Sequence, residues 1–153
     1  MALSAGDTAP DFTKKDQNGE ELTLSSLLQG QPVLLVFIPF AFTGVCQGEL
    51  CAIRDDYAEF TEKGVRVVAV SCDPGPTQKQ WAEEQGYQFS LVPDFWPHGA
   101  IAKGYGIFNE DLGCAMRGSF LVGQDGKVVD SFESGGLGEA REASRYAEAL
   151  AEL

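Results

Sequence analysis

The chain has 153 residues, of which 44% are hydrophobic and 22% are charged. These values are typical of a globular protein that buries a core of its own, and they exclude an intrinsically disordered chain. The chain carries 11 Lys and Arg residues against 23 Asp and Glu residues, which leaves a net charge of −12. Because this charge is repelled by phosphate backbones and anionic headgroups, nucleic acids and membrane surfaces are not expected partners.

No linker, repeat or low-complexity tract interrupts the chain, so we expect a single domain over residues 1–153. The longest apolar run, residues 33–42, is far shorter than the roughly 20 residues of a membrane span. The first ten residues have neither the basic nor the apolar segment of a secretory signal. These features predict a soluble cytoplasmic protein whose four cysteines are reduced thiols.

The first predicted elements are a hairpin and a short helix. Residues 11–15 and 21–24 flank an Asn-Gly pair at 18–19, which is the strongest short-range signal for a β-hairpin. Ser25 is a candidate N-cap for a short helix that ends near Gly30. The chain is therefore expected to begin with an N-terminal β-hairpin extension.

Buried strands and helices then alternate. Residues 32–38 are continuously apolar, as expected of a central strand covered on both faces, and residues 65–71 are predicted to form a second buried strand. Between them, residues 45–63 carry apolar side chains at helical spacing, which predicts an amphipathic helix that stops at Gly64. A loop then leads into a helix over residues 78–85. The order strand, helix, strand predicts a crossover between parallel strands.

The last third of the chain adds a short helix over residues 99–105, a hairpin of residues 117–122 and 127–132, and a final helix over residues 139–150. A β-α-β unit followed by a hairpin and a helix is the order of a thioredoxin-like fold. We therefore predict an α/β protein with a central mixed β-sheet flanked by helices.

Cys46 lies where the first buried strand gives way to the amphipathic helix, at the sheet edge where α/β proteins usually place their sites. If Thr43 is the N-cap, Cys46 is the third helical residue, and the positive end of the helix dipole favours its thiolate. The thiolate is the nucleophilic form of cysteine. A small buried residue at a helix start is the alternative, and position alone does not decide between the two.

A longer motif surrounds this cysteine. Pro39, Thr43 and Cys46 match the pattern P-x-x-x-[TS]-x-x-C, and Glu49 follows three residues later. This motif resembles the signature of the peroxiredoxin family, and within the family the chain is similar to the AhpE group. The segments that carry the resemblance are residues 9–12, 40–50, 94–99, 105–110 and 117–122.

The resemblance implies a reaction and a set of site residues. Cys46, as a thiolate, would attack one peroxide oxygen and become a sulfenic acid. Thr43 would hydrogen-bond the hydroperoxide, and the guanidinium of Arg117 would lie beside the sulfur. Pro39 would shape the pocket wall, and Glu49 would orient the guanidinium through an ion pair. Without the resemblance, Thr43 would be interpreted as an N-cap and Arg117 as a surface cation. Pro39 would be interpreted as a strand end and Glu49 as an acid in the first helical turn.

Cys51 follows Cys46 by five positions. Peroxiredoxins of the bacterioferritin-comigratory type include members that resolve the sulfenic acid with a cysteine at this offset, whereas the AhpE group generally uses an external thiol. In an intact helix, Cα atoms five residues apart are about 8.7 Å from each other, beyond the roughly 7 Å that a disulfide spans. A disulfide between the two cysteines would therefore require the first helical turn to unwind, and both routes stay open.

The remaining special residues receive no catalytic role. Cys72 ends a buried strand, and Cys114 is either near the pocket or simply buried. The chain has no C-x-x-C pair, and His98 is expected to cap a helix, so neither a metal site nor another cofactor is predicted. Trp81 and Trp96 are both expected in the core.

The sequence thus predicts a thiol-dependent peroxidase for hydrogen peroxide and organic hydroperoxides. The resemblance implies a homodimer and a thiol reductant, which could be thioredoxin, a mycoredoxin or a low-molecular-weight thiol. A thioredoxin-like disulfide oxidoreductase is one alternative, but Glu49 occupies the position where that class has its second cysteine. A non-catalytic redox-binding module on the same scaffold is the other.

Overall fold

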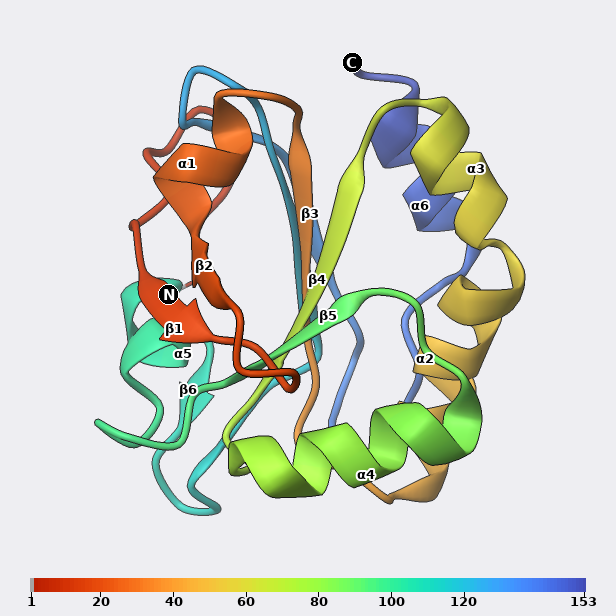
Figure 1. The fold of residues 1–153 in the computed structure, drawn as a ribbon. Coiled ribbons are helices and arrows are strands. Elements are labelled where there is room, and N and C mark those ends of the chain that lie inside the picture. Colours follow the sequence, from red (N-terminus) through yellow and green to blue (C-terminus); the bar gives the residue numbers. More distant parts are fainter. Residues whose placement is uncertain (1) are drawn as a thin grey trace.

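The computed structural model describes residues 2–153, which surround a five-stranded mixed sheet (Figure 1). The strand order is β5 (Ser90–Pro93), β4 (Arg66–Ser71), β3 (Val33–Phe37), β8 (Gly118–Val122) and β9 (Val128–Glu133). β3, β4 and β5 are parallel, whereas β8 is antiparallel to both β3 and β9. This is the predicted α/β fold with a central mixed sheet, although the sequence analysis did not predict β5.

Two apolar layers cover the sheet (Figure 1). The helices on one face are α2 (Gly44–Asp55), α3 (Tyr57–Glu62), α4 (Gly75–Gln85) and α6 (Ser144–Leu150). The other face is covered by α1 (Leu24–Leu28), α5 (Ala100–Gly104) and the N-terminal hairpin. Side chains alternate between the layers along each strand, because successive residues of a strand point to opposite faces. Within residues 2–153, no helix is long and apolar enough to cross a membrane.

The predicted N-terminal hairpin is present, as β1 (Thr13–Lys15) paired antiparallel with β2 (Glu21–Thr23). The predicted N-cap of α1 is wrong, because Ser25 lies inside the helix. The backbone N–H and the hydroxyl of Ser25 both donate to the carboxylate of Asp11, at 2.9 and 2.7 Å. A carboxylate from outside the helix thus satisfies an N–H that has no partner within it.

Three predicted helices differ from their expected bounds by more than one residue. The helix expected over residues 78–85 already begins at Gly75, with Pro76 in its first turn. The helix expected over residues 45–63 is two helices, α2 and α3, because Asp56 leaves the helical conformation at φ −100° and ψ 16°. The helix expected over residues 139–150 begins only at Ser144. The backbone N–H of Arg141 donates to the side chain of Glu49 at 2.8 Å, and this tertiary contact holds residues 139–143 outside the helix.

A short hairpin connects α5 to β8. It consists of β6 (Phe108–Asn109) and β7 (Cys114–Ala115), neither of which was predicted. β6 and β7 have two residues each, and β5 has four. Strands this short do not display a clear alternation of apolar and polar side chains. Their pairing therefore depends on neighbours that are distant in sequence.

Candidate active site

The centre of the site is the junction between β3 and α2. Thr43 is the N-cap residue of α2, with extended dihedral angles of −114° and 149°, so Cys46 is the third residue of the helix, as the sequence predicted. A 12-residue helix presents unpaired N–H groups and positive potential at this end. Cys46 is 1% exposed, so the thiol is buried beneath the junction and does not lie at the surface.

Arg117 reaches this thiol because of the strand register. β8 runs antiparallel to β3 with Ser119 opposite Val36, which brings the residue just before β8 beside the end of β3. Arg117 Nη1 donates to Cys46 Sγ at 3.1 Å and to Glu49 Oε1 at 2.7 Å. Its Nε donates to the carbonyl of Leu137 at 2.8 Å, and the residue is 4% exposed. The structure therefore brings together three residues of the sequence prediction.

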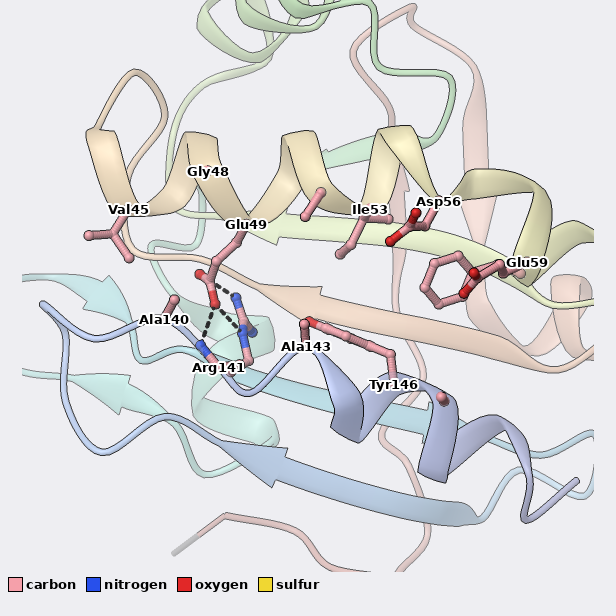
Figure 2. A pocket seen from close by; sticks show the side chains of 13 residues that line it. Val45, Gly48, Glu49, Ile53, Asp56, Glu59, Ala140, Arg141, Ala143 and Tyr146 are labelled. Carbon is pink, nitrogen blue, oxygen red and sulfur yellow. Dashed lines mark hydrogen bonds and ion pairs between the residues drawn. The ribbon is translucent and has the colours of Figure 1, made fainter.

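A second arginine, which the sequence analysis missed, completes the cluster. Arg141 Nε and Nη2 donate to the two carboxylate oxygens of Glu49, at 2.9 and 3.0 Å (Figure 2). Its Nη1 donates to the carbonyls of Phe37 and Gly118, both at 2.8 Å, which belong to β3 and β8. In the sequence this residue stands among charged and small residues and resembles a solvated helix face, so no local signal distinguished it.

The Arg117–Glu49–Arg141 cluster has an uneven charge balance. Burial by itself would raise the pKa of Glu49, but the hydrogen bonds and charge of Arg141, with the hydrogen bond from Arg117, outweigh it and lower that pKa. An ionised Glu49 neutralises one of the two guanidinium groups. The other leaves a positive charge in contact with the Cys46 sulfur.

The loop from β3 to α2 carries the other two predicted site residues. Pro39, two residues after the end of β3, is buried, whereas Thr43 is exposed. The Thr43 hydroxyl makes no cap to its helix and instead donates to the carbonyl of Phe40 at 2.7 Å. Because its proton is used in that bond, the Thr43 oxygen presents lone pairs and can accept a hydrogen bond.

Cys51 lies one and a half turns further along the intact helix, as a free thiol. Its sulfur contacts Gln85 Oε1 and the hydroxyl of Tyr87, both at 3.6 Å. The side chain therefore packs against the end of α4 and the segment that follows it.

The other two thiols are held in their protonated form. Burial, with a smaller effect from the nearby Asp94, raises the pKa of Cys72 to about 12. Burial also raises the pKa of Cys114, and the neighbouring Cys46 sulfur adds to this effect, whereas Arg117 opposes it. Neither group is a nucleophile at neutral pH.

Two smaller predictions are wrong. His98 does not cap a helix, because its ring nitrogens contact the carbonyls of Phe95 and Gly113 at 3.2 and 2.6 Å. The carboxylate of Asp94 caps α5 instead, accepting from two backbone N–H groups of its first turn. Trp81 is fully buried as expected, but Trp96 is 76% exposed. Residues 2–153 contain no group of three or more side chains arranged to hold a metal ion.

Comparison with known proteins agrees with this geometry. The sequence model of the AhpC/TSA family matches residues 5–131. The chain is 46% identical over 151 residues to alkyl hydroperoxide reductase E of Mycobacterium tuberculosis, covering 99% of this chain and 98% of that protein. It belongs to the AhpC/TSA family of peroxiredoxins.

Other peroxiredoxins are similar along most of the chain. Peroxiredoxin Bcp of Escherichia coli is 34% identical over 137 residues, which cover 86% of each protein. The crystal structure of peroxidoxin BcpB from Mycobacterium tuberculosis superposes with a TM-score of 0.85 at 33% identity, covering 98% of this chain and 96% of that one. As a peroxiredoxin, the protein is an oxidoreductase with thiol-dependent peroxidase activity, and the predicted family and thioredoxin-like fold are confirmed.

Proposed function

We propose that Cys46 is the thiol that reduces hydrogen peroxide and organic hydroperoxides. Its thiolate attacks one peroxide oxygen, a sulfur–oxygen bond forms and the oxygen–oxygen bond breaks. The products are a sulfenic acid on Cys46 and an alkoxide or hydroxide, which takes a proton from water. The observation that supports this most strongly is the 3.1 Å contact between Arg117 Nη1 and Cys46 Sγ in a buried site.

The same contact suggests the role of Arg117. Negative charge moves from the sulfur to the departing oxygen during the reaction, and a fixed guanidinium stabilises charge at both positions. Glu49 holds this guanidinium in place from the other side, at 2.7 Å. We assign Glu49 a positioning role, because its carboxylate is already committed to two arginines.

Thr43 and Pro39 would receive the substrate. The Thr43 oxygen can accept a hydrogen bond from the O–H of a hydroperoxide, because its own proton is donated to Phe40. Pro39 has no N–H to compete for the peroxide, and it is buried beside the junction. Both residues belong to the segment that leads from β3 into the helix of Cys46.

The experiment that tests this function measures peroxide consumption by the purified protein with a thiol reductant. We expect the Cys46→Ser variant to lose this activity, and the Cys72→Ser variant, which changes a thiol held in its protonated form, to keep it. Full activity in Cys46→Ser would refute the assignment. Loss of activity in both variants would show that the assay reports folding and not the nucleophile.

We further propose that an external thiol reduces the sulfenic acid. Cys51 is held by Gln85 and Tyr87 on an intact helix, so intramolecular resolution would require breaking both contacts and unwinding the first turn of α2. Thioredoxin, a mycoredoxin and a low-molecular-weight thiol are the candidate reductants. Mass spectrometry after one equivalent of peroxide should find sulfenic acid on Cys46, whereas a Cys46–Cys51 disulfide would establish the internal route.

We propose that the protein is a homodimer of the cytoplasm. Large apolar side chains are exposed in loops, namely Phe40, Phe42, Phe95, Trp96 and Leu112, and burying such side chains favours association. The four free cysteines suit a reducing compartment. Light scattering coupled to size-exclusion chromatography should give twice the chain mass for the wild type and a smaller mass for Trp96→Glu. A wild-type monomer at all concentrations would contradict the dimer.

A further inference from the structure

The loop in front of Cys46 has an unusual backbone conformation. Among residues 2–153, Phe42 is the one non-glycine residue with a positive φ, at 60°. A side chain with a Cβ disfavours this left-handed region, and the conformation persists only where the surrounding structure holds it. Phe42 is 47% exposed, and the covered part of its ring packs against the buried Trp81, with the ring centroids 6.0 Å apart.

A carboxylate from the segment after the neighbouring strand β4 accepts a hydrogen bond from this loop. Asp73 follows β4, which is parallel to β3, so both strands end at the same sheet edge. Asp73 Oδ2 accepts the backbone N–H of Ala41 at 2.8 Å. Ala41 is the residue before Phe42, and it belongs to the same core cluster as Cys46. The carboxylate therefore fixes the backbone at the point where the chain enters its disfavoured conformation.

Two further side chains fix the orientation of Asp73. Its Oδ2 also accepts the Ser71 hydroxyl, at 2.7 Å. Gln78 is fully buried, and its Nε2 donates to the Val92 carbonyl at 3.0 Å and to Ser71 Oγ at 2.9 Å. Because the carbonyl requires a donor, the amide nitrogen must face it, so Ser71 accepts from Gln78 and gives its own proton to Asp73. Each hydrogen bond in this series therefore has a fixed donor and a fixed acceptor. The series ends on the Asp73 carboxylate oxygen, which can only accept.

We propose that Asp73 is a positioning residue for the peroxidase reaction. Through Ala41 it holds Phe42 at positive φ and thereby fixes the place of Thr43, the N-cap of the helix that carries Cys46. The inference rests on the proposed function, in which Cys46 is the attacking thiol. Asp73 acts on the reaction only through the backbone of the loop.

Removal of the carboxylate has two opposite consequences. With Ala41 released, Phe42 relaxes toward negative φ, and Thr43 leaves the place where it can accept from a hydroperoxide. The same relaxation loosens the core cluster that Ala41 shares with Cys46, which is 1% exposed in the intact structure. The peroxide reaction should become slower, whereas attack by Cys46 on a simple alkylating agent should become faster.

The test compares Asp73→Ala with Asp73→Asn in the otherwise intact protein. Both bonds to Asp73 end on a single oxygen, so the amide oxygen of Asn can accept them while the charge is lost. We expect Asp73→Ala to lower the second-order rate constant with hydrogen peroxide by about tenfold to a hundredfold. The rate of Cys46 alkylation by iodoacetamide should rise several-fold in the same variant. Asp73→Asn should leave both rates within about threefold of the wild type.

Three results would overturn the proposal. They are equal peroxide rates in Asp73→Ala and the wild type, a parallel fall of both rates, and a loss in Asp73→Asn as large as in Asp73→Ala. An equal loss in Asp73→Asn would show that the slower peroxide reaction results from the lost charge and not from a displaced loop. If Asp73→Ala does not fold, Ser71→Ala replaces it, and the same opposite changes at smaller size are expected. Peroxidase activity that survives in the Cys46→Ser variant would refute the proposed function instead.

Discussion

Arg117 Nη1 lies 3.1 Å from Cys46 Sγ, although the two residues are 71 positions apart in the chain. The contact is made possible by the antiparallel register of β3 and β8, which places the residue before one strand beside the end of the other. Glu49, on the same helix as the cysteine, holds the guanidinium from its second side. Sulfur, guanidinium and carboxylate therefore form one buried unit.

Replacement of Arg117 should slow the reaction with peroxide. Arg117→Ala removes the donor that faces the sulfur and the departing oxygen, and the loss of one such donor typically costs about a hundredfold in rate. Arg117→Lys keeps a positive charge but lacks the planar guanidinium with its several donors, and its rate should fall less than that of Arg117→Ala. Stopped-flow measurement of the second-order rate constant with hydrogen peroxide checks both. Equal rates in the wild type and in Arg117→Ala would contradict a role in the chemical step.

Replacement of Arg141 should destabilise the fold. Arg141→Ala leaves the buried carboxylate of Glu49 with one arginine in place of two, and breaking a buried ion pair costs about 3–5 kcal/mol. Arg145 provides a control, because its bonds to Asp130 and Glu148 are partly exposed, and such pairs contribute about 0–1 kcal/mol. Urea unfolding measures the free energy of both variants. A similar loss in the two would contradict the importance of the buried cluster.

The lowered pKa of Glu49 predicts a loss of stability in acid. A carboxyl group whose pKa is lower in the folded than in the unfolded state stabilises the fold above its unfolded value, about 4.3 for Glu. This contribution disappears as the pH falls from that value through the folded pKa. Glu49→Gln should therefore show a smaller change in unfolding free energy between pH 6 and pH 3 than the wild type does. An unchanged pH dependence would show that the arginines do not hold Glu49 ionised.

The cysteines should differ in their reaction with alkylating agents. A thiol with a pKa of about 12 is about one part in ten thousand thiolate at pH 8, so Cys72 should resist labelling in the native protein. Cys114, whose pKa is also raised by burial, should behave in the same way. Peptide mapping after iodoacetamide treatment, with and without denaturant, measures each site. Native labelling of Cys72 as fast as that of Cys46 would contradict the prediction.

The elements that sequence reasoning predicted well are those with a strong local pattern. The two segments rich in apolar residues became β3 and β4, and the Asn-Gly pair lies in the turn between β1 and β2. Short strands and helix ends were predicted poorly, because they depend on partners elsewhere in the chain. The start of α6 is an example, since the contact of Arg141 with Glu49 keeps the preceding residues out of the helix.

The sequence by itself determined the fold class and the motif of Pro39, Thr43 and Cys46, because hydrophobic periodicity and short-range spacing are local properties of a chain. Only the tertiary structure decided that Arg141 joins the site, that Asp73 binds the backbone of the loop before α2, and that Cys46 is buried. These contacts come from strand register and from the hydrogen bonds of Arg141 to Glu49 on α2. A side chain such as Arg141 carries no local mark of the partner it will meet, since that partner is brought to it by strands and helices distant in sequence.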